Sequence, residues 1–286
     1  MRQNLSKIEQ CLVGGAIIKI VVISDPQINF NDMNTALQDI EILRECFKNM
    51  NVDAVVVCGD ITENARPQEM NAFFDAFKKY CPTKKLFAVP GNMDGVYDPK
   101  TQNAYFKAYE RFLGKKIETL YFLHEFANCF LIGISPEPID DGTITDAQFI
   151  FLEDALRKAN ECSLPALVFC HYQITETINT KWKYASLGSD SPRVRTILEK
   201  YNGKVVFFSG HTHRGLIKEI GGSVITKRNV TYISTPSICM PDVEHYNADN
   251  NNKGTGYFVE ADKINVIING FDFLNNAPLN SFNLII

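Results

Sequence analysis

The chain has 286 residues, a net charge of −4 and ordinary shares of hydrophobic (45%) and charged (22%) residues. This composition excludes a disordered, collagen-like or coiled-coil protein. The sequence has no lysine and arginine cluster dense enough to follow a nucleic-acid backbone, and no apolar run of the roughly 18–20 residues that span a bilayer. We therefore expect a globular protein with no generic nucleic-acid binding and no membrane-spanning segment.

The first 16 residues form a polar lead-in to the first predicted strand. The apolar stretch at residues 11–18 is short for a signal peptide and runs directly into that strand, so cleavage there would damage the fold. The eight cysteines include no C-x-x-C pair, and several lie in apolar strand runs. Buried, reduced thiols explain this pattern more simply than a disulfide framework does, and we expect a cytoplasmic protein.

In the first part of the chain, short β-branched runs alternate with amphipathic helical patterns. Apolar residues at i, i+4, i+7 and i+11 predict the first helix, and proline at the first helical position predicts the start of the second. The predicted strands span residues 17–24, 52–58 and 86–89, and the predicted helices span residues 31–50, 67–80 and 98–113.

Two further strands are predicted close together, at 119–125 and 129–134. A capping box at Thr145 and Gln148 then opens a helix to about residue 160. A strand at 166–170, a helix at 191–201 and a strand at 204–209 follow. Beyond residue 216 the sequence predicts strands alone, at about 216–220, 223–226, 230–234, 256–260 and 263–268.

This order of elements predicts an α/β protein with mixed sheets packed face to face and helices outside. We expect residues 1–16 to be the lead-in, residues 17–270 to form one domain, and residues 271–286 to be a C-terminal extension.

Polar residues follow the ends of five predicted strands, and ligand sites of α/β sheets lie beyond the carboxyl ends of strands. These segments together offer carboxylates, amides and imidazoles but no thiolate, a donor set that suits two divalent cations better than one zinc ion. The candidate residues are Asp25, Gln27, Asp60, Asn92, His171, His211 and His213. Glycine precedes Asp60, Asn92 and His211, where we expect it to permit a sharp turn.

Taken singly, most of these segments also have a structural explanation. Gly-Asp and Gly-Asn are common turn sequences, and His171 alone could be an interior histidine with satisfied hydrogen bonds. The His211-x-His213 pair is more specific, because two imidazoles so close together rarely serve packing.

In this order, the motifs D-x-Q, GD, GN-x-D, H and GH-x-H resemble those of the calcineurin-like metallophosphoesterases, over roughly residues 18–268. The resemblance implies a four-layer αββα sandwich with two mixed β-sheets and a dinuclear metal centre. It implies that Asp60 bridges the two metals. It assigns the first metal to Asp25, Gln27, Asp60 and His213, and the second to Asp60, Asn92, His171 and His211.

The chain departs from the usual family pattern at two positions. Gln27 stands where the family usually has histidine, and this harder donor set favours Mn or Fe over Zn, with Mg as a further candidate. Met93 stands where many members have a histidine that assists the leaving group, and a thioether cannot donate a proton. The resemblance gives catalytic roles to Asn92, Asp94 and His171.

We expect hydrolysis of a small anionic phosphoester by a metal-bridging hydroxide, with phosphodiesters preferred. Two divalent cations, two aspartates and the hydroxide would leave the site with a charge of about +1, which suits an anionic substrate. Three alternatives stay open: a protein phosphatase, a small-molecule phosphomonoesterase, and a catalytically weak scaffold that retains the fold. The sequence does not indicate an oligomeric state.

Two long loops, residues 172–192 and 236–256, are the predicted determinants of specificity. Their aromatic side chains could stack on a substrate or merely pack the loops. They include Trp182, Tyr184, His245 and Tyr246.

Overall fold

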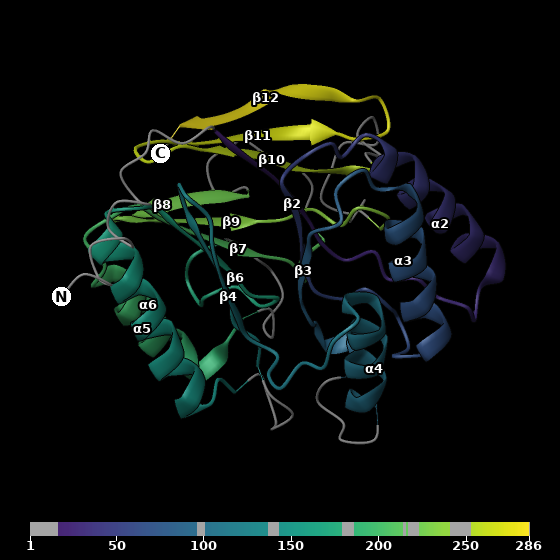
Figure 1. The fold of residues 1–286 in the computed structure, drawn as a ribbon, viewed down its shortest axis with the longest axis horizontal. Coiled ribbons are helices and arrows are strands. Elements are labelled where there is room, and N and C mark those ends of the chain that lie inside the picture. Colours follow the sequence, from purple (N-terminus) through teal and green to yellow (C-terminus); the bar gives the residue numbers. More distant parts are fainter. Residues whose placement is uncertain are drawn as a thin grey trace, which may run out of the picture.

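The computed structural model describes residues 17–95, 101–136, 143–178, 186–213, 216, 223–240 and 253–285. These residues form two six-stranded sheets that lie face to face between two layers of helices (Figure 1). The predicted four-layer αββα sandwich with two mixed sheets is confirmed.

The first sheet has the strand order β12-β11-β10-β1-β2-β3. Its β1, β2 and β3 are parallel, whereas β10, β11 and β12 join antiparallel on the other side of β1. The strands are β1 (Ile18–Ile23), β2 (Ala54–Cys58), β3 (Leu86–Val89), β10 (Thr255–Ala261), β11 (Val266–Asp272) and β12 (Ala277–Ile285).

The second sheet has the strand order β4-β5-β6-β7-β9-β8. Its four central strands are parallel, and the strands at both edges are antiparallel to their neighbours. The strands are β4 (Phe122–Glu125), β5 (Phe130–Gly133), β6 (Ala166–Phe169), β7 (Val205–Ser209), β8 (Val224–Lys227) and β9 (Val230–Ser234).

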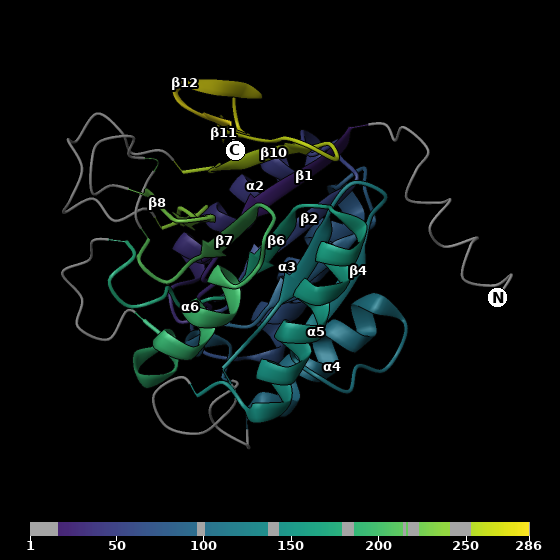
Figure 2. The same cartoon turned by 90° about the vertical axis from the view of Figure 1, so that its left-hand side faces the viewer.

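The helices cover the outer face of each sheet, as Figures 1 and 2 show. Three pack on the first sheet and two on the second. They are α2 (Met33–Lys48), α3 (Pro67–Tyr80) and α4 (Gln102–Leu113) on one side, and α5 (Asp146–Cys162) and α6 (Ser191–Glu199) on the other. Short 3₁₀ turns, η1 (Asn92–Asp94) and η2 (Gly188–Asp190), lie in the loops.

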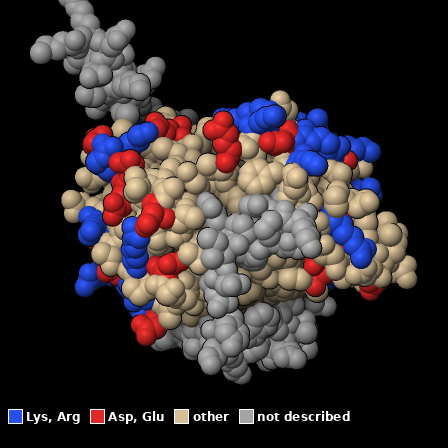
Figure 3. Space-filling model, turned by 90° about the horizontal axis from the view of Figure 1, so that it is seen from below, with Lys and Arg blue, Asp and Glu red and all other residues tan. Residues whose placement is uncertain are grey.

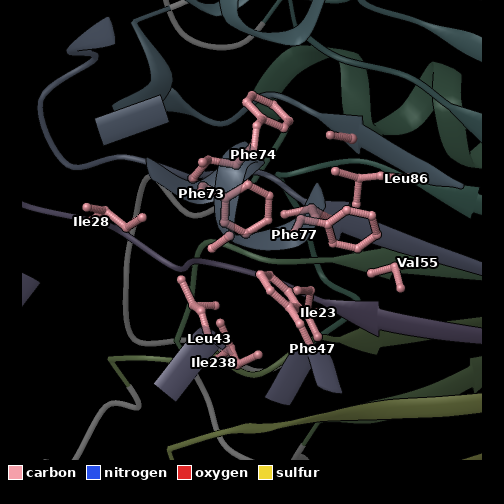
Figure 4. Packing of buried hydrophobic residues seen from close by; sticks show 14 of the residues in the cluster. Ile23, Ile28, Leu43, Phe47, Val55, Phe73, Phe74, Phe77, Leu86 and Ile238 are labelled. Atoms are coloured by element: carbon pink, nitrogen blue, oxygen red, sulfur yellow. The ribbon is translucent and has the colours of Figure 1, made fainter. Parts of the chain in front are cut away.

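Side chains along a strand point alternately to the two faces of its sheet, and both faces are apolar. In β1, Val21 and Ile23 pack toward the helices, and Ile20 and Val22 pack between the sheets. The outer layer on the first sheet is rich in phenylalanine from α2 and α3 (Figure 4). Burial on both faces is typical of parallel strands with layers on each side.

The C-terminal end of the chain differs from the prediction. Residue 270, where the sequence analysis ended the domain, lies inside β11, and the unpredicted β12 adds an edge strand to the same sheet. β12 contains a proline and two asparagines, which weaken a strand signal and are tolerated at a sheet edge. The strand predicted at 216–220 lies outside the described residues, apart from residue 216, which is not in a strand.

Charges of both signs lie on the molecular surface. Seen from below, lysine and arginine side chains lie around the periphery of the described face together with aspartate and glutamate (Figure 3).

Among the helices of the described segments, none has both the length and the apolar composition needed to cross a membrane. None of the cysteines in the described part of the chain forms a disulfide, and all of them except Cys162 are buried.

Candidate metal centre

Two overlapping clusters of metal-ligating side chains lie beyond the strand ends of the two sheets. Asp60, His171 and His211 form one cluster, and Asp25, Asp60 and His213 form the other. Within each cluster the ligand atoms lie within 4.8 Å of one another. Asp60 belongs to both clusters, so these five residues from four separate loops form one continuous site.

Hydrogen bonding orients the imidazole of His171. Its Nδ1 lies 2.8 Å from the carbonyl oxygen of Cys58, which can only accept, so Nδ1 carries the proton. Its Nε2 faces two oxygens, Asp60 Oδ2 at 3.2 Å and Asn92 Oδ1 at 3.0 Å. A histidine whose second nitrogen is anchored in this way is typical of metal ligands.

Asp25 connects to both histidines of the GH-x-H segment. Its Oδ1 lies 3.3 Å from His213 Nε2, and the backbone N–H of His211 donates to both carboxylate oxygens at 3.1 and 3.2 Å. Residues 186 positions apart are thereby held together. The side chain of His213 is 16% exposed, whereas that of Asp25 is 0% exposed.

Backbone contacts place Gln27 and Met93 beside Asp60. Gln27 is buried, and its N–H donates to the carbonyl of Asp60 at 2.9 Å. The N–H of Met93 donates to Asp60 Oδ1 at 2.7 Å. This contact comes from the backbone of residue 93, so it does not depend on the side chain at that position.

Asp94 lies beneath the loop of Asn92 rather than at the surface of the site. It is fully buried, and its two carboxylate oxygens accept hydrogen bonds from the N–H groups of Thr62 (3.0 Å) and Gly91 (2.9 Å). Burial, together with the nearby charge of Asp60, raises the pKa of Asp94 to about 7. The position of this carboxyl suits a role in holding the loop that carries Asn92.

Unfavourable backbone conformations are concentrated in the site. Among the described residues, ten positions other than glycine have positive φ, and five of them are candidate ligands. Such conformations cost about 1–3 kcal/mol each and persist where the surrounding structure enforces them. The five candidate ligands are Asp25 (50°), Gln27 (43°), Asp60 (49°), His211 (68°) and His213 (50°).

Two of the glycines before candidate ligands are required for different reasons. Gly59 has φ +91°, a conformation that side chains rarely adopt. Gly91 has an ordinary φ of −108°, but a Cβ there would lie 2.1 Å from Asp60 Oδ1. The predicted sharp turn therefore accounts for Gly59, whereas Gly91 is needed for close approach to Asp60.

The buried carboxylates create a field that favours positive charge. Burial opposes protonation of His171, but the charges of Asp60 and Asp25 outweigh it and raise the pKa of His171 to about 9. The pKa of His213 is raised in the same way against the effect of its burial, chiefly by Asp25. Burial alone would raise the pKa of Asp25, yet the two histidines lower it. The same field would attract cations.

A buried glutamate that the sequence analysis did not single out ties two of the site's loops together. Glu69, in the first turn of α3, is fully buried and accepts hydrogen bonds from the N–H groups of Phe30 (2.9 Å) and Asn64 (3.2 Å). Phe30 follows Gln27 in the chain and Asn64 follows Asp60, so one carboxylate connects both loops. Sequence alone marks Glu69 only as a polar residue at the start of a helix.

An aromatic side chain borders the second cluster. The ring of the half-buried Tyr172 lies 5.3 Å from the ring of His171 and 4.7 Å from that of His211, measured between centroids. The other predicted specificity residues, Trp182, Tyr184, His245 and Tyr246, lie outside the described residues.

The donor set fits a pair of divalent cations. Each cluster combines carboxylate and imidazole, the amide of Asn92 adjoins one of them, and Asp60 can serve both. Oxygen and nitrogen donors without thiolate suit Mn, Fe, Mg or Zn. Backbone groups also bond the side chains of Asp25, Asp60 and His171, as is typical of the neighbours that orient metal ligands.

Comparison with known proteins agrees with this architecture. A model of the calcineurin-like phosphoesterase family matches residues 18–215. A dimetal phosphatase from Danio rerio has a similar structure, with a TM-score of 0.63, 14% identity and coverage of 95% of this chain and 99% of that one. GAP50, described as the anchor in the inner membrane complex of Plasmodium, has a TM-score of 0.61 at 12% identity, covering 94% of this chain and 88% of its own. No curated protein matches the sequence.

The αββα sandwich with metal-ligating side chains at its strand ends has the architecture of a metallophosphoesterase. The family match spans well over half of the sequence, and the chain belongs to the calcineurin-like phosphoesterase family. This confirms the resemblance inferred from the five motifs.

Proposed function

We propose that the protein hydrolyses small anionic phosphoesters and prefers phosphodiesters. The observation that carries this proposal is the pair of ligand clusters that share Asp60. A carboxylate common to two sets of donors supports a dinuclear centre, and dinuclear centres suit the in-line displacement at phosphorus.

We assign the two metals as the family pattern implies. Asp25, Gln27, Asp60 and His213 would hold the first, and Asp60, Asn92, His171 and His211 the second. The contacts of Asp60 with His171 and of Asp25 with His213 support this division. The amide of Gln27 makes the first set harder, which favours Mn or Fe.

The residues of the site would bind and orient the substrate. When bound, two divalent cations supply Lewis-acid stabilisation of the phosphoryl oxygens and an activated water nucleophile. Nδ1 of His171 is bonded to the carbonyl of Cys58, so Nε2 is the nitrogen that would bind a metal. We propose that Asp94 holds the loop of Asn92 in place, because both its oxygens bind backbone N–H groups.

The preference for diesters rests on the charge of the site, which would be about +1 with two divalent cations, two aspartates and a hydroxide, and which a singly charged diester neutralises. Because Met93 supplies no acid, the test uses substrates whose leaving group needs no proton from the protein. With Mn²⁺, we expect bis(p-nitrophenyl) phosphate to be hydrolysed faster than p-nitrophenyl phosphate. Initial rates measured at equal substrate concentration test this. A faster monoester reaction would reject the diesterase assignment.

Met93→His is expected to raise phosphomonoesterase activity by about 10²-fold, since an acid near the leaving group typically contributes 10²–10⁴-fold. The substitution keeps the backbone N–H that donates to Asp60. The measurement is kcat/KM for an alkyl phosphomonoester such as glycerol 2-phosphate, whose leaving group needs a proton. Met33→His, at a half-exposed residue of α2, is the matched control and should leave the rate unchanged. An unchanged rate in Met93→His would show that this position does not govern monoester hydrolysis.

A scaffold without catalysis is the second candidate. The similar structure of GAP50, described as an anchor, favours it as an alternative. Metal analysis of protein purified without chelator separates the two functions. About two equivalents of metal per chain would support the hydrolase, and none would support the scaffold.

A further inference from the structure

Asp25 is held in a conformation that its own sequence context disfavours. Its φ is 50°, although it carries a side chain and precedes Pro26. A residue before proline prefers an extended backbone, and positive φ adds further strain. Asp25 is also fully buried, so water cannot satisfy its backbone groups. The surrounding protein must therefore stabilise this conformation.

Ser237 supplies a direct contact to the backbone of Asp25. Its hydroxyl donates to the carbonyl oxygen of Asp25 at 2.7 Å and accepts from the N–H of Met240 at 2.8 Å. The neighbouring N–H of Ile238 donates to the carbonyl of Ser24 at 2.9 Å. Ser237 is fully buried. The segment after β9 therefore runs beside the end of β1 and is bonded to it at consecutive residues.

Other contacts hold the remaining groups of Asp25. Its N–H donates to the carbonyl of Gly59 at 3.0 Å, and its carboxylate accepts from the N–H of His211. The N–H, the carbonyl and the carboxylate are thus each bonded to a different segment. Removing the bond at the carbonyl would allow the peptide to turn toward the extended conformation that Pro26 favours. That turn would carry the carboxylate away from His213.

We propose that Ser237 is a positioning residue for the first metal site, where it fixes Asp25. Ser237 lies outside the five motifs and offers no ligand itself. The metal-binding part of this inference rests on the proposed dinuclear function, whereas the fixing of Asp25 does not. Asp25 belongs to one cluster only, so the effect of Ser237 should fall on one metal more than on the other.

Ser237→Ala is expected to weaken the binding of one Mn²⁺ equivalent by about 10- to 100-fold, as is typical when a partner of a metal ligand is removed. The affinity for the second Mn²⁺ equivalent should change much less. Isothermal titration of chelator-treated protein with Mn²⁺ measures both. Ser191→Ala is the matched control, because Ser191 is equally buried and its hydroxyl bonds the N–H and hydroxyl of Thr175 rather than a candidate ligand. Equal weakening of Mn²⁺ binding at both equivalents would overturn the metal-site role, and so would unchanged binding of both.

Amide hydrogen exchange of the chelator-treated protein tests the fixing of Asp25 without any metal. The N–H groups of Asp25 and His211 should exchange at least about 10-fold faster in Ser237→Ala than in the wild type and in Ser191→Ala. Unchanged exchange at both amides would overturn the proposal. If the wild type binds fewer than two Mn²⁺ ions but Ser237→Ala accelerates this exchange, the dinuclear function fails and Ser237 still fixes Asp25.

Discussion

Asp60→Asn is expected to reduce phosphodiesterase activity by about 10³-fold and to lower Mn²⁺ uptake from about two equivalents to one or fewer. Asp60 is the residue common to both ligand clusters. The substitution removes a negative charge from a fully buried position and replaces one oxygen with an NH₂ group, which cannot bind a cation. Both metals should therefore be affected, and the rate and the metal content should fall together.

Asp39→Asn provides the matched control for this prediction. Asp39 is equally buried, on α2, and its carboxylate pairs with Lys253 at 3.0 Å, outside either ligand cluster. Burial raises the pKa of Asp39, although its bond to Lys253 opposes this rise. The control should keep two metals and full activity. If Asp60→Asn also kept both, the shared-carboxylate arrangement would be wrong.

The second large effect is expected for Gly91→Ala. The backbone of Gly91 suits alanine, but the added Cβ would lie 2.1 Å from Asp60 Oδ1 and 2.5 Å from the backbone nitrogen of Asp60. Contacts this close cannot persist, so the loop carrying Asn92 must separate from the loop carrying Asp60. We expect loss of metal binding, a fall in activity of about 10²-fold or more, and destabilisation by about 1–3 kcal/mol.

Metal titration, kcat and urea unfolding together test the Gly91→Ala prediction. Gly114→Ala is the control, because Gly114 ends α4 with φ +68° and a Cβ there would meet nothing within 4 Å. This control should cost stability through backbone strain and leave the metal site intact. Retention of both metals in Gly91→Ala would show that the loops can separate without losing the site.

Several elements could be predicted closely because their local signals agree with their tertiary setting. The helix at Pro67–Tyr80 and the strand at Leu86–Val89 occur with the predicted bounds. In the helix, proline at the first position and phenylalanines spaced along one face both predict the observed helix. In the strand, an apolar run fits burial on both faces. β12 was missed because its residues carry little preference and pairing with β11 determines its conformation.

The candidate ligands were also recognisable from sequence, since each follows a strand and parallel strand ends meet at one edge of a sheet. Their chemical types, in order along the chain, indicated the family that the comparison confirmed. The roles of individual ligands stay predictions until metal binding is measured.

Local patterns along the chain suffice to predict the layered α/β fold, the order of its elements and the candidate ligands, because hydrophobic periodicity, helix signals and polar residues after strands all appear in short segments. The groups that support those ligands become visible only in the folded molecule. Glu69 joins the loops after Gln27 and Asp60, and Ser237 bonds Asp25 from 212 residues away. The left-handed backbone of Asp25 is likewise invisible locally, where Pro26 favours the opposite conformation. Such contacts arise between segments that only folding brings together, so no local pattern records them.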